Sequence, residues 1–116
     1  MSIQRLGIGA RMSRAVVHGS TVYLAGQVAD KAVGASVPEQ THEILGIIDA
    51  ILAEAGTDKT KILSATIYLA DIATFSQMNS EWDKWVPQGH TPARATVEAK
   101  LAAPQYTVEI AVIAAK

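Results

Sequence analysis

The chain has 116 residues, of which 49% are hydrophobic and 18% charged, and its formal net charge is −1. This length predicts one domain, residues 1–116, and excludes a second domain of ordinary size. The balanced charge gives no broad positive field, so nucleic-acid binding is not expected. The hydrophobic content is high for a small monomer, which predicts that part of the surface is buried against other subunits.

The sequence contains no cysteine, which excludes disulfides and thiolate chemistry and suits a reducing cytoplasm. No apolar run approaches the roughly 20 residues that span a bilayer, and the N-terminus lacks the apolar core of a signal peptide. The three histidines do not have metal-ligand spacing. We therefore expect a soluble cytoplasmic protein with no membrane segment and no metal.

The first half of the chain predicts two strands and a helix. Residues Ala15–His18 and Thr21–Gln27 are β-prone runs separated by a Gly-Ser pair, which is typical of a hairpin. Ser36 opens the sequence SVPE, a capping-box pattern with proline in the first turn. Apolar residues then recur with helical spacing up to Ala55, and Gly56 ends this amphipathic helix.

The second half predicts a strand, a helix and two further strands. Ile62–Leu69 alternates as a half-buried strand, and a second amphipathic helix follows Asp71 and stops at Pro87. The last two strands are Ala93–Lys100 and Tyr106–Ala115. The order β-β-α-β-α-β-β predicts an α+β subunit, one sheet with two helices on one face. Because the strands are too apolar for the other face to meet water, a second subunit is the simplest cover.

Arg94 begins a strand among small residues that leave its guanidinium room to reach a ligand. The alternation places Arg94, Thr96 and Glu98 on one face of that strand. A guanidinium binds a carboxylate or a phosphate through two parallel charge-assisted hydrogen bonds. The alternative is a structural ion pair between Arg94 and an acidic residue at a subunit contact.

Glu109 is the one carboxylate in the last strand, which is otherwise nearly all apolar. A half-buried carboxylate is costly unless it is hydrogen-bonded, paired or protonated. Such a group suits acid–base chemistry. The alternative is an interface salt bridge, including one to Arg94 itself.

Four segments together resemble the Rid (reactive intermediate deaminase) family, also called YjgF, in matching order over nearly the whole chain. They are AGQ at 25–27, MN at 78–79 before Trp82, HTPARATVE at 90–98 and VEIAVIA at 108–114. The resemblance implies a chorismate-mutase-like subunit. It also implies a homotrimer whose sheets form a barrel-like assembly, with clefts between neighbouring subunits.

The resemblance implies an enzyme that needs no cofactor and hydrolyses reactive enamines and imines, such as 2-aminoacrylate, to 2-keto acids and ammonia. By position, Arg94 matches the arginine that pairs with the substrate carboxylate, and Glu109 matches the glutamate that positions water. Gly26 and Thr96 match residues whose backbone lines the cleft. Met12 stands where many members place a tyrosine, so the chain resembles an arginine-retaining branch divergent from archetypal RidA.

Two other functions stay open on the sequence. A non-catalytic protein would hold a small carboxylate, such as a keto acid, in the same cleft. An endoribonuclease is the third possibility, because that name is attached to some relatives, but the balanced charge argues against it.

Overall fold

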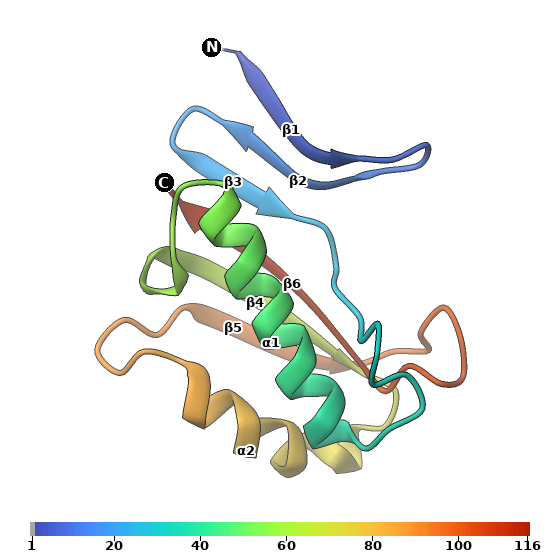
Figure 1. The fold of residues 1–116 in the computed structure, drawn as a ribbon. Helices are drawn as coiled ribbons and strands as arrows, with labels where there is room; N and C mark the ends of the chain where they lie inside the picture. Colours follow the sequence, from blue (N-terminus) through green and yellow to red (C-terminus); the bar gives the residue numbers. More distant parts are fainter. Residues whose placement is uncertain (1) are drawn as a thin grey trace.

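The structure, a computed structural model that describes residues 2–116, is one six-stranded sheet with two helices on one face (Figure 1). The α+β architecture predicted from the sequence is confirmed. The strands are β1 (Ile3–Ile8), β2 (Ser13–His18), β3 (Thr21–Leu24), β4 (Ile62–Leu69), β5 (Ala93–Glu98) and β6 (Val108–Ala115). The helices are α1 (Val37–Glu54) and α2 (Phe75–Trp85), and short 3-10 turns, η1 (Lys59–Lys61) and η2 (Ile72–Thr74), precede β4 and α2.

The strand order across the sheet is β1-β2-β3-β6-β4-β5. Within the described chain the neighbouring strands run antiparallel, except that β4 and β5 run parallel. Helix α2 makes the crossover between these two parallel strands. The topology therefore brings the last strand, β6, to the middle of the sheet and leaves β5 at one edge.

The sequence did not predict strand β1, so the observed order is β-β-β-α-β-α-β-β. This strand pairs with β2 from Ile3 opposite His18 to Ile8 opposite Ser13. It has one neighbour and lies at the sheet edge opposite β5, with its side chains mostly exposed. Its sequence, IQRLGI, does not alternate apolar and polar residues regularly, which is why the pattern of the sequence does not reveal it.

The helix ends lie close to the predicted positions. Ser36 caps α1, since its Oγ accepts the Glu39 N–H at 3.4 Å and its hydroxyl donates to Glu39 Oε1 at 3.0 Å. Asp71 caps the turn η2 and not α2 itself, because α2 begins at Phe75. The strand predicted to reach Gln27 ends at Leu24.

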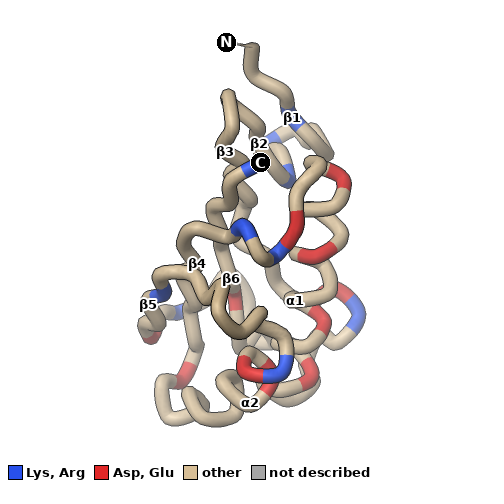
Figure 2. The backbone as a smooth tube through the Cα atoms, turned by 90° about the vertical axis from the view of Figure 1, so that its left-hand side faces the viewer, with Lys and Arg blue, Asp and Glu red and all other residues tan. Residues whose placement is uncertain are grey.

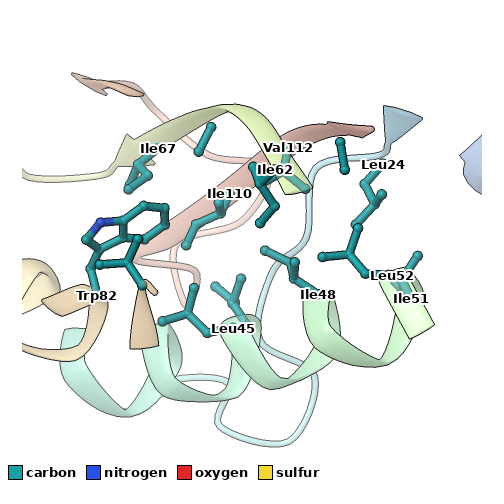
Figure 3. Packing of buried hydrophobic residues seen from close by; sticks show 14 of the residues in the cluster. Leu24, Leu45, Ile48, Ile51, Leu52, Ile62, Ile67, Trp82, Ile110 and Val112 are labelled. Atoms are coloured by element: carbon teal, nitrogen blue, oxygen red, sulfur yellow. The ribbon is translucent and has the colours of Figure 1, made fainter. Parts of the chain in front are cut away.

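The hydrophobic core lies between the sheet and the helices (Figure 3). Helix α1 packs its apolar side against the centre of the sheet, where β6 and β4 lie side by side. The fully buried side chains of this layer include Ile44, Ile48, Leu52, Ile67 and Ile110. Burying a side chain of this size stabilises the fold by about 1.5–3 kcal/mol relative to leaving it exposed.

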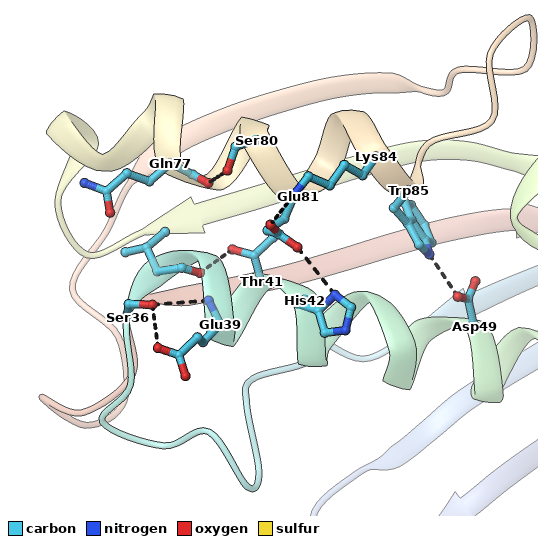
Figure 4. Close-up of polar contacts among 11 residues, drawn as sticks. Ser36, Glu39, Thr41, His42, Asp49, Gln77, Ser80, Glu81, Lys84 and Trp85 are labelled. Atoms are coloured by element: carbon cyan, nitrogen blue, oxygen red, sulfur yellow. Dashed lines mark hydrogen bonds and ion pairs between the residues drawn. The ribbon is translucent and has the colours of Figure 1, made fainter.

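Polar contacts join α2 to α1 on the side away from the sheet (Figure 4). The indole N–H of Trp85 donates to Asp49 Oδ2 at 2.9 Å. His42 Nδ1 lies 3.4 Å from Glu81 Oε1. These contacts add to the packing of α2 on α1, so α2 is a fixed support for whatever its sheet-facing side chains hold.

The other face of the sheet has no helix on it. One row of paired residues crosses it, from Val16 through Tyr23, Ile113 and Ser64 to Ala93. Most of this row is apolar, and Tyr23 is 46% exposed. A broad apolar face of this kind marks an interaction surface. Neither helix within residues 2–116 is long and apolar enough to cross a membrane.

Candidate functional site

Arg94 is the second residue of β5 and lies at the sheet edge. It pairs with Ala65 of β4, whose buried side chain faces the helices, so Arg94 points to the helix side of the sheet. There its Nη1 donates to Asn79 Oδ1 at 2.8 Å. The guanidinium carbon also lies 5.7 Å from the ring centroid of Phe75 and 5.2 Å from that of Trp82. The Arg94 guanidinium therefore packs against helix α2 through these three side chains.

Glu109 lies on the opposite face of the sheet. It pairs with Tyr68 of β4, between residues whose side chains face the core, so its half-buried carboxylate lies on the face without helices. Among residues 2–116 neither Glu109 nor Arg94 forms an ion pair. The salt bridge between them that the sequence left open is therefore not made within one chain.

The Glu109 carboxylate lies directly over the backbone of Gly26. A Cβ built on Gly26 would overlap Glu109 Oε2 and would lie 3.0 Å from its Cδ. The neighbouring backbone is fixed, because Gln27 N–H donates to Ile110 O at 2.8 Å and Ile110 N–H donates to Gln27 O at 3.0 Å. The structure thus brings Gly26 and Glu109 together. The carboxylate occupies the space in which a side chain at position 26 would lie.

Thr96 lies two residues after Arg94 and on the same side of β5, paired with Ile67. Its hydroxyl is buried without a hydrogen-bond partner in the part of the chain that the structure describes. Met12 lies in the turn between β1 and β2, and its side chain is 66% exposed. Because that hairpin and β5 are at opposite edges of the sheet, one chain does not bring Met12 to Arg94.

A second carboxylate fixes the loop that follows Gly26. Glu43 of α1 accepts hydrogen bonds from the backbone N–H groups of Lys31, Ala32 and Asp30, at distances of 2.6–3.1 Å. These bonds, with that from Lys31 first, lower the pKa of Glu43 below its ordinary value. The loop from Gly26 to the start of α1 is therefore tied to the helix layer.

The partners of Arg94 were not recognised as such in the sequence. The helical spacing of Phe75 and Trp82 indicates packing in the core or at an interface; Trp82 is buried beside Arg94, and Phe75 is 39% exposed in one chain. The sequence marks Asn79 only as part of the segment MN at 78–79, which resembles the Rid family. The available signal is the spacing of 75, 79 and 82, which places these three residues on one helix face. Among residues 2–116 there is no group of three His, Asp or Glu side chains arranged to hold a metal ion.

Comparison with known proteins gives consistent matches over the whole chain. The family model described as Endoribonuclease L-PSP matches residues 2–116. A RutC family protein of Haemophilus influenzae is 47% identical, and the match covers 98% of each chain. The RutC family protein YoaB of Escherichia coli is 45% identical, with 99% of each chain covered.

Solved structures agree with these sequence matches. A YjgF-family protein of Neisseria meningitidis superposes with a TM-score of 0.97 at 44% identity, covering 100% of this chain and 96% of that one. A YjgF-family member of Mycobacterium tuberculosis gives 0.89 at 26% identity, with 99% and 100% covered. On the family model, the relatives and the shared fold together, the chain belongs to the Rid/YjgF family.

Proposed function

We propose that this chain is a homotrimeric enzyme that hydrolyses reactive 2-imino acids, and the enamines in equilibrium with them, to 2-keto acids and ammonia. One observation supports this most directly. Arg94 and Glu109, the two groups suited to hold a carboxylate and a water molecule, lie on opposite faces of one sheet. A ligand that touches both groups must lie between two copies of the chain. The apolar sheet face without helices is the surface through which we expect these copies to associate.

Arg94 suits the carboxylate of the substrate. A guanidinium has five N–H donors, and Asn79 accepts from Nη1. Donors on the remaining nitrogens stay available to form two parallel hydrogen bonds to a carboxylate. Met12 on the hairpin turn, Gly26 and Thr96 are the proposed lining of the same cleft.

Glu109 suits the water. In the proposed reaction the enamine first tautomerises to the imine. Glu109 then takes a proton from the water as its oxygen bonds to the imine carbon, the C=N electron pair moves to nitrogen, and Glu109 passes that proton to the nitrogen. In the resulting aminoalcohol, Glu109 moves the hydroxyl proton to the amino nitrogen, the C–N bond breaks, and the keto acid and ammonia are released. A positioned general base contributes typically ~10²–10⁴-fold, and the fixed carboxylate adds orientation. No cofactor takes part in this scheme, and the chain without cysteine suits the cytoplasm.

The description of the family model, Endoribonuclease L-PSP, makes a ribonuclease the second candidate function. Along the tube in Figure 2, Lys and Arg are interspersed with Asp and Glu and do not form one basic stripe. Binding of an RNA backbone rests mainly on clustered positive charge. We therefore favour a small anionic substrate over RNA.

The first test separates binding from turnover. Arg94→Ala is expected to lose both keto acid binding and keto acid release from a freshly generated imino acid. Glu109→Gln is expected to keep binding and to lose turnover by roughly 10²–10⁴-fold. Lys84→Ala, which removes an exposed positive charge from α2, is the matched control and should behave as wild type.

Equal rates for wild type and Arg94→Ala would overturn the proposed reaction. A wild-type protein that binds keto acids but releases none from the imino acid would instead establish the non-catalytic carboxylate binder. Cleavage of RNA by wild type that Glu109→Gln abolishes would assign the site to the ribonuclease.

A further inference from the structure

The three side chains that contact the Arg94 guanidinium come from one face of α2, at positions 75, 79 and 82. We propose that Asn79, assisted by the rings of Phe75 and Trp82, is a positioning residue that fixes the guanidinium of Arg94 for carboxylate binding. The identity of the ligand in this inference rests on the proposed function, whereas the positioning itself rests on contacts within one chain.

These contacts orient the guanidinium and leave most of its N–H donors available to a ligand. Asn79 accepts from one terminal nitrogen, Nη1, at 2.8 Å. The two aromatic rings lie within 6 Å of the guanidinium carbon, the range of a cation–π contact. A planar group held at one nitrogen and against rings has lost much of its rotational freedom, so less freedom remains to be lost when a ligand binds.

The chemistry of the amide suits this task better than a carboxylate would. An Asn oxygen accepts a hydrogen bond without adding negative charge, so the positive charge of Arg94 stays available for an anion. An Asp at position 79 would orient the same nitrogen but would offset that charge. The contact between half-buried Asn79 and Arg94 is therefore a hydrogen bond to a neutral acceptor and not an ion pair.

The α2 side chains that contact Arg94 are themselves held in place by the rest of the helix layer. Trp82 is 5% exposed and its ring lies 5.4 Å from that of Trp85. Trp85 in turn donates to Asp49 of α1. The orientation of Arg94 is thus set through α2 by the helix layer, although Arg94 belongs to an edge strand, where side chains have few neighbours.

The test uses pyruvate as the probe and the full chain. For Asn79→Ala we expect the pyruvate dissociation constant and the KM for the imino acid to rise about tenfold, as for loss of a hydrogen bond to a charged group, while kcat changes by less than about twofold. ¹⁵N relaxation of the Arg94 Nε–H should show a lower order parameter. Asn79→Asp should restore that order but not the affinity. Gln77→Ala, on the exposed face of α2, is the control.

Each outcome bears on one of the two proposals. If Asn79→Ala leaves both the Arg94 Nε–H order parameter and the pyruvate affinity unchanged, the positioning role is overturned. The role is also overturned if the variant loses pyruvate affinity about tenfold while the order parameter stays unchanged. A wild type that binds no pyruvate overturns it as well. A wild type that binds pyruvate but has no imino acid turnover overturns the proposed reaction alone. Thermal unfolding of each variant, with Phe75→Leu as a second probe of the same contact, separates a loss of folding from a loss of orientation.

Discussion

Gly26 determines where the Glu109 carboxylate lies, although the glycine itself has no group that reacts. The carboxylate occupies the volume in which any side chain at position 26 would begin. The colliding atom is the far end of a flexible side chain and not backbone. A side chain at position 26 therefore displaces the carboxylate, while the sheet keeps its hydrogen bonds.

If Glu109 is the base of the proposed reaction, Gly26→Ala is expected to lower turnover nearly as much as Glu109→Gln does, by roughly 10²–10⁴-fold, because the carboxylate is moved out of its place. The free energy of unfolding should change little. Keto acid release and urea unfolding of the same preparation measure the two effects.

The matched control is Gly46→Ala on α1, where an added Cβ meets nothing within 4 Å. This change should leave turnover intact and raise the free energy of unfolding by about 0.5–1 kcal/mol, since alanine favours a helix over glycine. Full activity in Gly26→Ala would contradict the proposed role of the Glu109 carboxylate that lies over this residue.

Helix α1 holds the loop after Gly26 through one side chain, Glu43. Its pKa is lowered because backbone N–H groups, that of Lys31 first, donate to the charged form. A group with a lowered folded pKa stabilises the fold fully above its ordinary pKa, 4.5 for this glutamate. That stabilisation is lost as the pH falls through the lower folded pKa.

Glu43→Gln should therefore lower the midpoint of urea unfolding at pH 7, and the difference from wild type should shrink as the pH falls below about 4.5. Glu54→Gln, at an exposed position near the end of the same helix, is the control for exchanging a carboxylate for an amide and should keep the wild-type midpoint at pH 7. A difference between Glu43→Gln and wild type that is constant from pH 7 to pH 3 would contradict the role of the charged carboxylate.

The strands whose residues alternate were predictable from the sequence, whether or not a single chain buries them: β5 is as exposed as β1, but Arg94, Thr96 and Glu98 alternate with alanine and valine along it. Strand β6 alternates buried and half-buried residues along its length, which is the pattern that singled out Glu109. Strand β1, with the sequence IQRLGI, does not alternate apolar and polar residues regularly, so it carries no such period. The same reason applies to the site. Arg94 follows from its strand, but its contact with Asn79 joins residues 15 apart in sequence through the packing of α2, which no local pattern records.

At the scale of the whole molecule, part of the high apolar content of the chain lies outside the core, on the face without helices. Ala95 and Val97 of β5 lie in the same rows as Ala111 and Glu109 of β6, through Thr66 and Tyr68 of β4. Val97 is 44% exposed. In the proposed trimer this face is buried, so the surface that holds the subunits together is also the one that carries Glu109.

Ala95→Lys places a charge on that face at an exposed position, where a single chain has room for it. We expect wild type to sediment at three times the 12.3 kDa of the chain and this variant at the monomer mass, since burying unpaired charges at an interface is costly. Its circular dichroism should remain that of a folded α+β protein. Turnover should fall to the level of Arg94→Ala, because Arg94 and Glu109 no longer meet across subunits. Ala53→Lys, on the exposed side of α1, should remain a trimer with full activity. A monomeric variant that keeps wild-type turnover would show that one chain completes the site alone.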